Sequence, residues 1–408
     1  MRNDYESLLR QTNASPGDLG HRLADAASGL TAPTDRHLGA VYDIGRWVAA
    51  PLLIPYVMWI LSDAHRRDLR RLYFVARDGQ ILLAIARQIV AQLPFDGELR
   101  YLYGSRYAWQ ESDPHSHAPV SCSRIDGGHN LSLLEQYFEQ EGVFTPVPSG
   151  FVDIGWRGSL HEMVASKQRA RGTPIVHGYV FGSTRKNYQF FQKYHAYAFD
   201  YGRDYFRDPL LSDFESFRNI AECFAAANHD TVVRLEQRDD VIVPCFGQGW
   251  RKAARSWGID TLHRAVTEVA TSLDLGGCVA DEPRRMARVA KPVLRTFWQR
   301  PTLHEARAWA RFPAEDGHGP TERRESFAEP FQASDLGDIS LLLQQRMRKR
   351  PRFWLHGAMR LTPMPHRLIF AAANMVADLL SVGDRAARKM RRWLDDVHPG
   401  VWMVPPMI

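Results

Sequence analysis

Residues 71–83 read RLYFVARDGQILL, and this stretch decides the fold. Residues 71–76 form a short apolar run rich in strand-forming side chains, and the run stops at the tripeptide RDG, residues 77–79. Over residues 80–93 the apolar side chains then recur at helical spacing until a Pro and a Gly interrupt the pattern. The segment predicts a buried strand followed directly by a helix, which is the first half of a βαβ unit.

Three more strands are predicted further along the chain, over residues 99–103, 150–154 and 175–181. Helical patterns lie between them, over residues 130–142, with Asn130 as the expected N-cap, and from Leu160 onward. Strands that alternate with helices are joined by crossovers, so the sequence predicts an α/β fold with a mostly parallel sheet.

The pattern divides the chain into four regions. These are a helical N-terminal region (1–70), an α/β core (71–250), a second helical region (251–340) and a basic helical tail (341–408). The most apolar run, residues 47–61, is shorter than the roughly 20 residues that span a bilayer. We therefore expect a buried helix there and a cytoplasmic protein.

Composition excludes several classes of protein. Of the 408 residues, 45% are hydrophobic and 24% are charged, which is typical of a globular chain and not of a disordered or fibrous one. The four cysteines form no CxxC pair, which argues against a disulfide scaffold and a structural zinc site. No GxGxxG, P-loop or HExxH motif occurs.

Positive charge is concentrated in the tail. The whole chain has a net charge of +6, yet residues 341–400 alone carry more positive charge than that excess, mainly in clusters at 346–350 and 385–392. The simplest interpretation of the tail is a helix whose apolar face packs on the core and whose charged ends are solvated. The alternative is that the tail docks on the anionic inner face of a membrane or on a partner protein of a biosynthetic complex. Nucleic acid is unlikely, because no nucleic-acid-binding motif accompanies the charge.

Each predicted strand ends in small or polar residues: RDG at 77–79, GSR at 104–106, DIGWRGS at 153–159 and GST at 182–184. In a parallel sheet the ligand lies beyond the carboxyl ends of the strands, so these four segments should converge on one site. The competing interpretation is that the Asp side chains cap turns and that Arg–Asp pairs hold loops.

The residue types at these ends suit an anionic ligand. Asp78 and Asp153 are suited to hold Mg²⁺, which commonly takes one or two protein carboxylates plus water and phosphate oxygens. The Ser105 hydroxyl and the backbone amides of residues 155–159 are donors for phosphate. Arginine binds such an anion through two parallel hydrogen bonds, and three arginines lie at these strand ends: Arg77, Arg106 and Arg157.

The segments YFVARDGQILL (73–83), YLYGSR (101–106) and FVDIGWRGSL (151–160) resemble HAD-like (haloacid dehalogenase superfamily) proteins found among polysaccharide-biosynthesis genes. The resemblance is specific over residues 71–160. It implies a doubly wound sheet, Mg²⁺ and an aspartyl-phosphate intermediate. By position it implies that Asp78 is the nucleophile, Ser105 the phosphate-binding hydroxyl and Asp153 a metal ligand. Gln80 stands where the family usually has a second Asp.

The expected site therefore has Asp78 and Ser105 as catalytic residues and Asp78 and Asp153 as metal ligands. Trp156 is expected to stack on a sugar ring. The remaining expected substrate-binding residues are those that flank these positions: Arg77, Gly79, Arg106, Arg157, Gly158 and Ser159.

Three functions remain open on the sequence. The first is a HAD-like enzyme that hydrolyses or transfers the phosphoryl group of a phosphorylated or nucleotide-activated sugar, in surface polysaccharide biosynthesis. The second is a glycosyltransferase-like enzyme that uses a sugar nucleotide at the same edge. The third is a non-catalytic scaffold of a membrane-associated biosynthetic complex.

Overall fold

The structure is a computed structural model. It describes residues 4–12, 19–111, 132–156, 158–183, 194–200, 218–278, 282–316, 323–332, 354–364 and 366–368. By their internal contacts the residues fall into two units, 1–326 and 327–408. The first unit contains the sheet and every element discussed below, apart from one short helix of the second unit.

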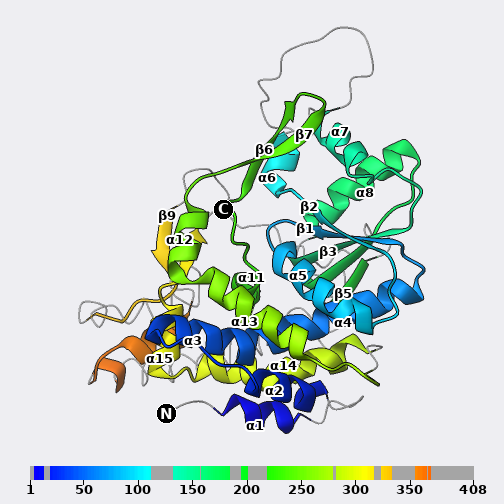
Figure 1. Ribbon diagram of the computed structural model, residues 1–408. Helices are drawn as coiled ribbons and strands as arrows, with labels where there is room; N and C mark the ends of the chain where they lie inside the picture. Colours follow the sequence, from blue (N-terminus) through cyan, green and yellow to red (C-terminus); the bar gives the residue numbers. More distant parts are fainter. Residues whose placement is uncertain are drawn as a thin grey trace, which may run out of the picture. The chain divides into compact units, whose positions relative to one another are not determined.

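A five-stranded parallel sheet forms the centre of the first unit (Figure 1). Its strands are β1 (Arg71–Val75), β2 (Glu98–Leu102), β3 (Ser149–Trp156), β4 (His177–Ser183) and β5 (Tyr194–Asp200). Their order across the sheet is β2-β1-β3-β4-β5, and every neighbouring pair is parallel. The predicted α/β fold with a mostly parallel sheet is confirmed. The chain moves outward in opposite directions from β1 and from β3, so a topological switch point lies between these two strands.

Two details of the sheet differ from the prediction. Strands β3 and β4 run further than expected, because Gly155 pairs with Gly182 and Trp156 with Ser183 in the β3–β4 register. Strand β5 was not predicted, since its sequence YHAYAFD mixes polar rings with alanine and has no apolar run. The central residues of β5, Ala196 to Ala198, are nevertheless buried.

Helices cover both faces of the sheet. The side chains of Tyr73, Val75 and Phe151 point to one face, where they join a core cluster that includes residues of α6 (Arg106–Glu111), α7 (Leu133–Gln140) and α8 (Ser159–Arg171). The opposite face packs against α4 (Ala50–Arg66) and α5 (Gly79–Ile89), and α13 (Ile259–Ser272) packs on α5 (Figure 1). Helix α7 is capped by Ser132 in a capping box, and the expected N-cap, Asn130, lies outside the described residues.

The N-terminal region is helical, as predicted. It comprises α1 (Tyr5–Arg10), α2 (Leu19–Ser28), α3 (Arg36–Ile44), a π-helical turn η1 (Gly45–Ala49) and α4. The continuous run Arg36–Arg66 is long and apolar enough to cross a membrane, but 89% of its most apolar window is buried. The prediction of a buried helix over residues 47–61 is confirmed.

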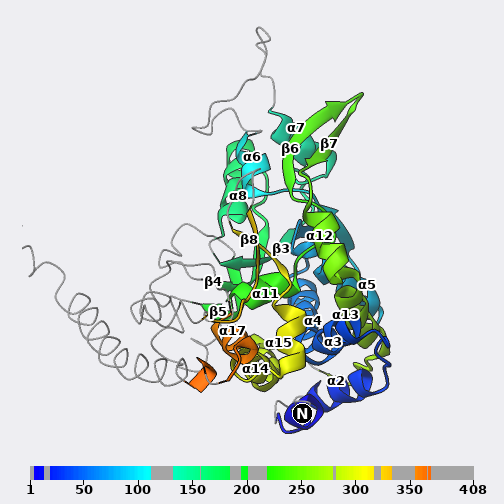
Figure 2. The same ribbon diagram turned by 90° about the vertical axis from the view of Figure 1, so that its left-hand side faces the viewer.

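The helices that follow the sheet pack against these N-terminal helices. They are α11 (Arg218–Phe224), α12 (Trp250–Trp257), α13, α14 (Pro283–Gln299) and α15 (Leu303–Trp309). Figure 2 shows α3, α4, α13, α14 and α15 gathered at one end of the unit. The turn η1 and helix α13 lie especially close together, because a Cβ atom on Gly45 of η1 would lie 2.8 Å from the Cβ of Ala265 in α13.

Two antiparallel hairpins complete the first unit. Strands β6 (Val232–Arg238) and β7 (Val241–Phe246) form the first, as the polar turn at 239–240 predicts. The second consists of β8 (Pro313–Asp316) and β9 (Arg323–Ser326). In the second unit, α17 (Leu355–Leu361) is tied to Phe331, whose backbone N–H donates to the Thr362 hydroxyl at 3.0 Å. The basic clusters at 346–350 and 385–392 lie outside the described residues.

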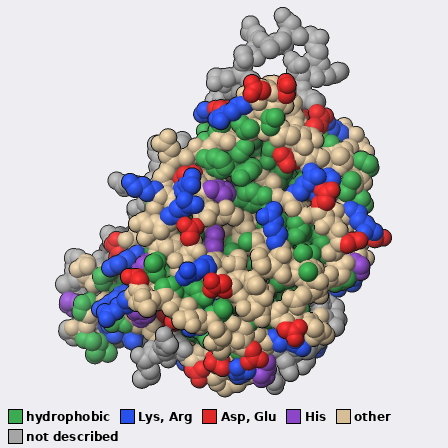
Figure 3. All heavy atoms as spheres, viewed as in Figure 1, with side chains coloured by type: hydrophobic (Ala, Val, Ile, Leu, Met, Phe, Trp, Pro, Cys, Tyr) green, Lys and Arg blue, Asp and Glu red, His purple; other side chains and the backbone are tan. Residues whose placement is uncertain are grey.

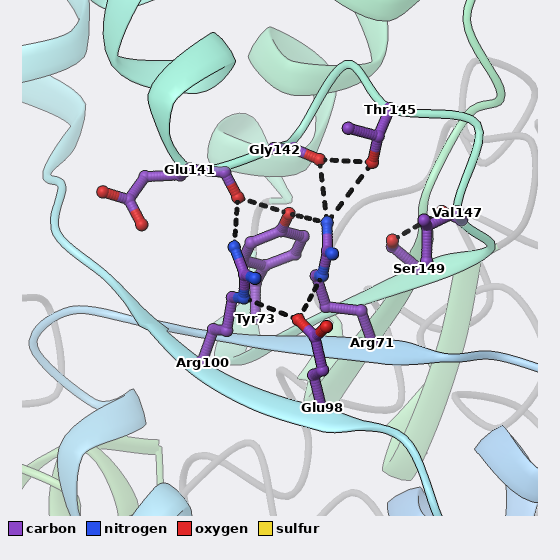
Figure 4. Close-up of polar contacts among 9 residues, drawn as sticks. All are labelled: Arg71, Tyr73, Glu98, Arg100, Glu141, Gly142, Thr145, Val147 and Ser149. Carbon is purple, nitrogen blue, oxygen red and sulfur yellow. Dashed lines mark hydrogen bonds and ion pairs between the residues drawn. The ribbon is translucent and has the colours of Figure 1, made fainter.

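A polar network fastens the amino ends of β1 and β2 to the loop before β3 (Figure 4). The Arg71 side chain, only 9% exposed, donates to the Glu98 carboxylate at 2.9 Å and to the Gly142 carbonyl at 3.1 Å. It also donates to two hydroxyls, those of Tyr73 and Thr145. Arg100 bridges the same Glu98 carboxylate and the Glu141 carbonyl. The network therefore fixes the end of the sheet opposite to the candidate site.

Replacing Gly79 with Ala should destabilise the protein by about 1–3 kcal/mol, because the core there is already full. A Cβ atom at residue 79 would lie 2.5 Å from the carbonyl carbon of Phe74, a backbone atom that cannot move aside. Gly29→Ala is the matched control, since its nearest neighbour would be at 3.8 Å. Urea unfolding of both variants measures the effect. Equal stability of the two variants would refute this account of how α5 packs on β1.

Candidate functional site

The candidate site lies at the carboxyl ends of β1 and β3, where the strand order switches. Asp78 lies three residues after the last residue of β1 and immediately before the first residue of α5. Asp153 lies within β3, paired with Val180 of β4. Each residue as a whole is partly exposed, while its carboxyl group is buried. This is the place where open α/β sheets bind their ligands.

Asp78 is in an environment that disfavours its charge. Burial raises the pKa of the Asp78 carboxyl well above its ordinary value, and the negative charges of Asp153 and Glu222 raise it further. The Arg77 guanidinium opposes the shift. Within the part of the chain that the structure describes, the Asp78 carboxylate forms no hydrogen bond or ion pair, although it occupies the N-cap position of α5. The interpretation of Asp78 as a helix cap is therefore not supported.

Asp153 is held more firmly. Burial raises the pKa of its carboxyl, while the Arg106 charge and the backbone N–H groups of Ile154 and Gly155 favour the ionised form, as His161 does when its ring is protonated. The Tyr56 hydroxyl, from α4, donates to the Asp153 backbone carbonyl at 2.7 Å. Asp153 is thus held by the backbone N–H groups of the two residues that follow it and by the Tyr56 hydroxyl of α4.

His161, in the first turn of α8, lies close enough to Asp153 for the two side chains to interact electrostatically. Its ring is 5% exposed, and its Nε2 lies 3.2 Å from the Phe151 carbonyl, to which it donates in the neutral form. Burial lowers the pKa of His161, and the nearby Asp153 charge opposes this shift. A neutral imidazole therefore packs beside the Asp153 carboxylate.

Two helices begin at this edge without a side-chain cap. Asp78 and Gly158 are the N-cap residues of α5 and α8, and neither supplies a capping hydrogen bond. Gly158 adopts a left-handed φ of +64°, a conformation that favours glycine, and Ser159 is the first residue of α8. Backbone N–H groups at such helix ends are suited to an anion. Arg157 lies outside the described residues.

Ser105 performs a structural task. Its hydroxyl donates to the Val232 carbonyl at 2.7 Å and accepts from the Ala108 N–H at 3.0 Å. It therefore caps the start of α6 and ties β2 to the hairpin. Arg106, the next residue, lies close enough for its charge to favour ionised Asp153.

Trp156 lies beneath the site. It is 3% exposed, and its ring packs against Phe181 and over Gly182, where a Cβ atom would be 2.5 Å from the indole. A sugar ring therefore has no exposed Trp156 face on which to stack in this structure. The side chain instead fills the space that a glycine leaves open.

Asp78 and Asp153 are the carboxylates at this site that could hold Mg²⁺. Among the described residues no group of three or more His, Cys, Asp or Glu side chains is placed to hold an ion. Mg²⁺ usually takes one or two carboxylates and completes its shell with water and phosphate. Asp78 and Asp153, which disfavour each other's charge, provide such a pair, and a divalent cation would relieve their repulsion.

Glu222 was not predicted as a site residue. It comes from α11, is exposed, and acts electrostatically on Asp78. The segment ECFAAANH (222–229) has no pattern that ties it to the β1 turn, so only the tertiary fold reveals the pairing. His161 was missed for a similar reason, because a single His inside a helix carries no local signal.

No protein-family model matches this sequence, and a search of curated proteins finds no match. The account of the site therefore rests on the geometry and electrostatics above.

Proposed function

We propose that this chain is a HAD-like, Mg²⁺-dependent enzyme that hydrolyses or transfers the phosphoryl group of a phosphorylated or nucleotide-activated sugar. The supporting observation is Asp78. A carboxylate that lacks partners among the described residues, beside a second carboxylate at the switch point, costs stability and serves no visible structural purpose. Perturbed carboxylates of this kind cluster at functional sites.

Asp78 is the proposed nucleophile. Its carboxylate oxygen forms a bond to phosphorus while the bond from phosphorus to the leaving oxygen breaks, and the leaving oxygen takes up a proton. Water or an acceptor hydroxyl then cleaves the aspartyl phosphate. When bound, Mg²⁺ would neutralise charge on the carboxylates and on the phosphoryl oxygens.

The other roles follow from position. The amides at the start of α5 and α8 bind the phosphoryl oxygens, and Arg77 and Arg106 supply positive charge on either side. Gln80 cannot transfer a proton, and its side chain is engaged with Asn228 through two hydrogen bonds of 2.9 Å. We assign proton transfer to Glu222, an exposed residue whose negative charge raises the pKa of Asp78.

The test is phosphate release from a panel of sugar phosphates and nucleotide sugars, with and without Mg²⁺ and with an acceptor sugar. Wild type should turn over at least one substrate only when Mg²⁺ is present. Asp78→Asn should lower the rate at least about 1,000-fold, as removal of a nucleophile does. Asp96→Asn is the control, because that carboxyl is exposed and paired with Arg70. Turnover that survives Asp78→Asn would refute the assignment of the nucleophile.

A further inference from the structure

Four aromatic rings gather where β2 ends and the β6–β7 hairpin begins. Each is within about 6 Å of another member of the cluster, as ring centres in contact are. Tyr103 lies 5.0 Å from Tyr101, 6.0 Å from His229 and 5.6 Å from Phe246. His229 and Phe246 are 5.4 Å apart. We call this group the aromatic cluster.

The aromatic cluster is open to solvent. Phe246 is 41% exposed, and the other three rings are partly exposed. Hydrophobic side chains gather over the region of α6 and the hairpin on the face shown in Figure 3. The exposed Phe246 ring, which is contacted edge to face by Tyr103, offers a flat face on which a planar ligand can stack.

Two members of the aromatic cluster, Tyr101 and His229, have their polar side-chain atoms engaged with each other and with the backbone. The Tyr101 hydroxyl lies 2.6 Å from His229 Nε2, and His229 Nδ1 lies 2.8 Å from the Asp230 carbonyl. The carbonyl only accepts, so Nδ1 carries the proton and Nε2 accepts from Tyr101. Burial and the charge of Arg77 lower the pKa of His229, which agrees with this neutral form. Tyr101 and His229 therefore contribute ring surface to the cluster, while their polar side-chain atoms already have partners.

The aromatic cluster adjoins the phosphoryl site through Arg77. Tyr101 lies within the electrostatic reach of both Asp78 and Arg77, and His229 within that of Arg77. The Arg77 guanidinium is 5.8 Å from the centre of the Trp250 ring. A ligand that spans both places carries an anionic group at one end and a planar ring at the other.

We propose that the aromatic cluster is the base subsite of a nucleotide, so that the substrate is a nucleoside-diphosphate derivative and not a simple sugar phosphate. This inference rests on the proposed function, whose phosphoryl site it extends. The base stacks on the exposed Phe246 ring, which Tyr103 contacts edge to face at an interplanar angle of 84°. His229 and Tyr101 hold these rings in place, and Arg77 lies between the base and the phosphates.

The experiment compares ligands that share phosphates and differ in the base. Isothermal titration calorimetry of the full chain with Mg²⁺ measures binding of UDP, ADP and inorganic pyrophosphate. At least one nucleotide should bind about tenfold more tightly than pyrophosphate, since stacking of a base on an aromatic side chain typically gives a factor of this order. Phe246→Ala should remove that advantage and leave pyrophosphate binding unchanged. Val241→Ala is the matched control, because Val241 is 50% exposed at the other end of β7.

The outcomes separate this inference from the proposed function. Nucleotides that bind no better than pyrophosphate, or a nucleotide advantage that Phe246→Ala leaves intact, would overturn the base subsite; Mg²⁺-dependent phosphate release from a sugar phosphate would then still support the enzyme. Binding of none of the three ligands would also overturn it. Nucleotide binding that depends on Phe246, without phosphoryl release from any substrate, would support the subsite and reject the reaction.

Discussion

Asp78→Asn should make the metal-free protein more stable while it abolishes the proposed reaction. The asparagine keeps the shape of the side chain and removes a charge that burial, Asp153 and Glu222 all disfavour. A functional site commonly costs stability, and relieving such a site yields about 1–2 kcal/mol. Calorimetry in the presence of a chelator should therefore show a melting temperature raised by a few degrees. Asp96→Asn, at an exposed carboxyl, should change it far less.

The pH dependence of this difference follows from the direction of the pKa shift. The Asp78 pKa is raised in the folded protein, so at pH values between the unfolded and the folded pKa the folded state binds more protons than the unfolded state does. The stability penalty of Asp78 is thus fully present above its folded pKa. It is lost as the pH falls through the folded pKa toward the unfolded value of about 3.9. Wild type and Asp78→Asn should converge in stability at acid pH, and a difference that stays constant from neutral to acid pH would contradict this account.

Arg71→Ala should reduce the free energy of unfolding by about 3 kcal/mol, because it removes a nearly buried guanidinium together with its hydrogen bonds to four partners, the buried Tyr73 hydroxyl among them. The guanidinium joins β1, β2 and the loop before β3 through the contacts of Figure 4. Arg70→Ala is the matched control one residue away. Arg70 is 53% exposed, and its ion pairs among the described residues are with the exposed carboxylates of Asp68 and Asp96, so its loss should cost less than about 1 kcal/mol. Urea unfolding measures both, and similar losses in the two variants would show that the network does not hold the sheet.

The strands nearest the site were predictable because their signals are local. The run 71–76 and the RDG turn identify β1 and the start of α5 from adjacent residues alone. Strand β5 was not predictable from its sequence, because alternating aromatic rings and alanines give no strand signal until β4 provides a hydrogen-bonded neighbour.

The chemistry of the site was only partly predictable. The sequence placed Asp78 and Asp153 at strand ends. Asp78 does follow the end of β1, whereas Asp153 lies within β3, which continues to Trp156. The roles expected of Ser105 and Trp156 depended on which way their side chains point, and tertiary neighbours decide that: the Val232 carbonyl for Ser105 and the space above Gly182 for Trp156. Glu222 reaches Asp78 from a distant helix, so no pattern near residue 78 announces it.

The most direct test of the central claim is a thermal unfolding titration with Mg²⁺ in the presence of inorganic phosphate, on wild type, Asp78→Asn and Asp153→Asn. If the two carboxylates form the ion and phosphate site, the wild-type melting temperature rises with ligand. The stabilisation should approach about 2.7 kcal/mol at 100 times the dissociation constant, and both variants should lose most of it. Equal stabilisation of all three proteins, or none in wild type, would contradict the account.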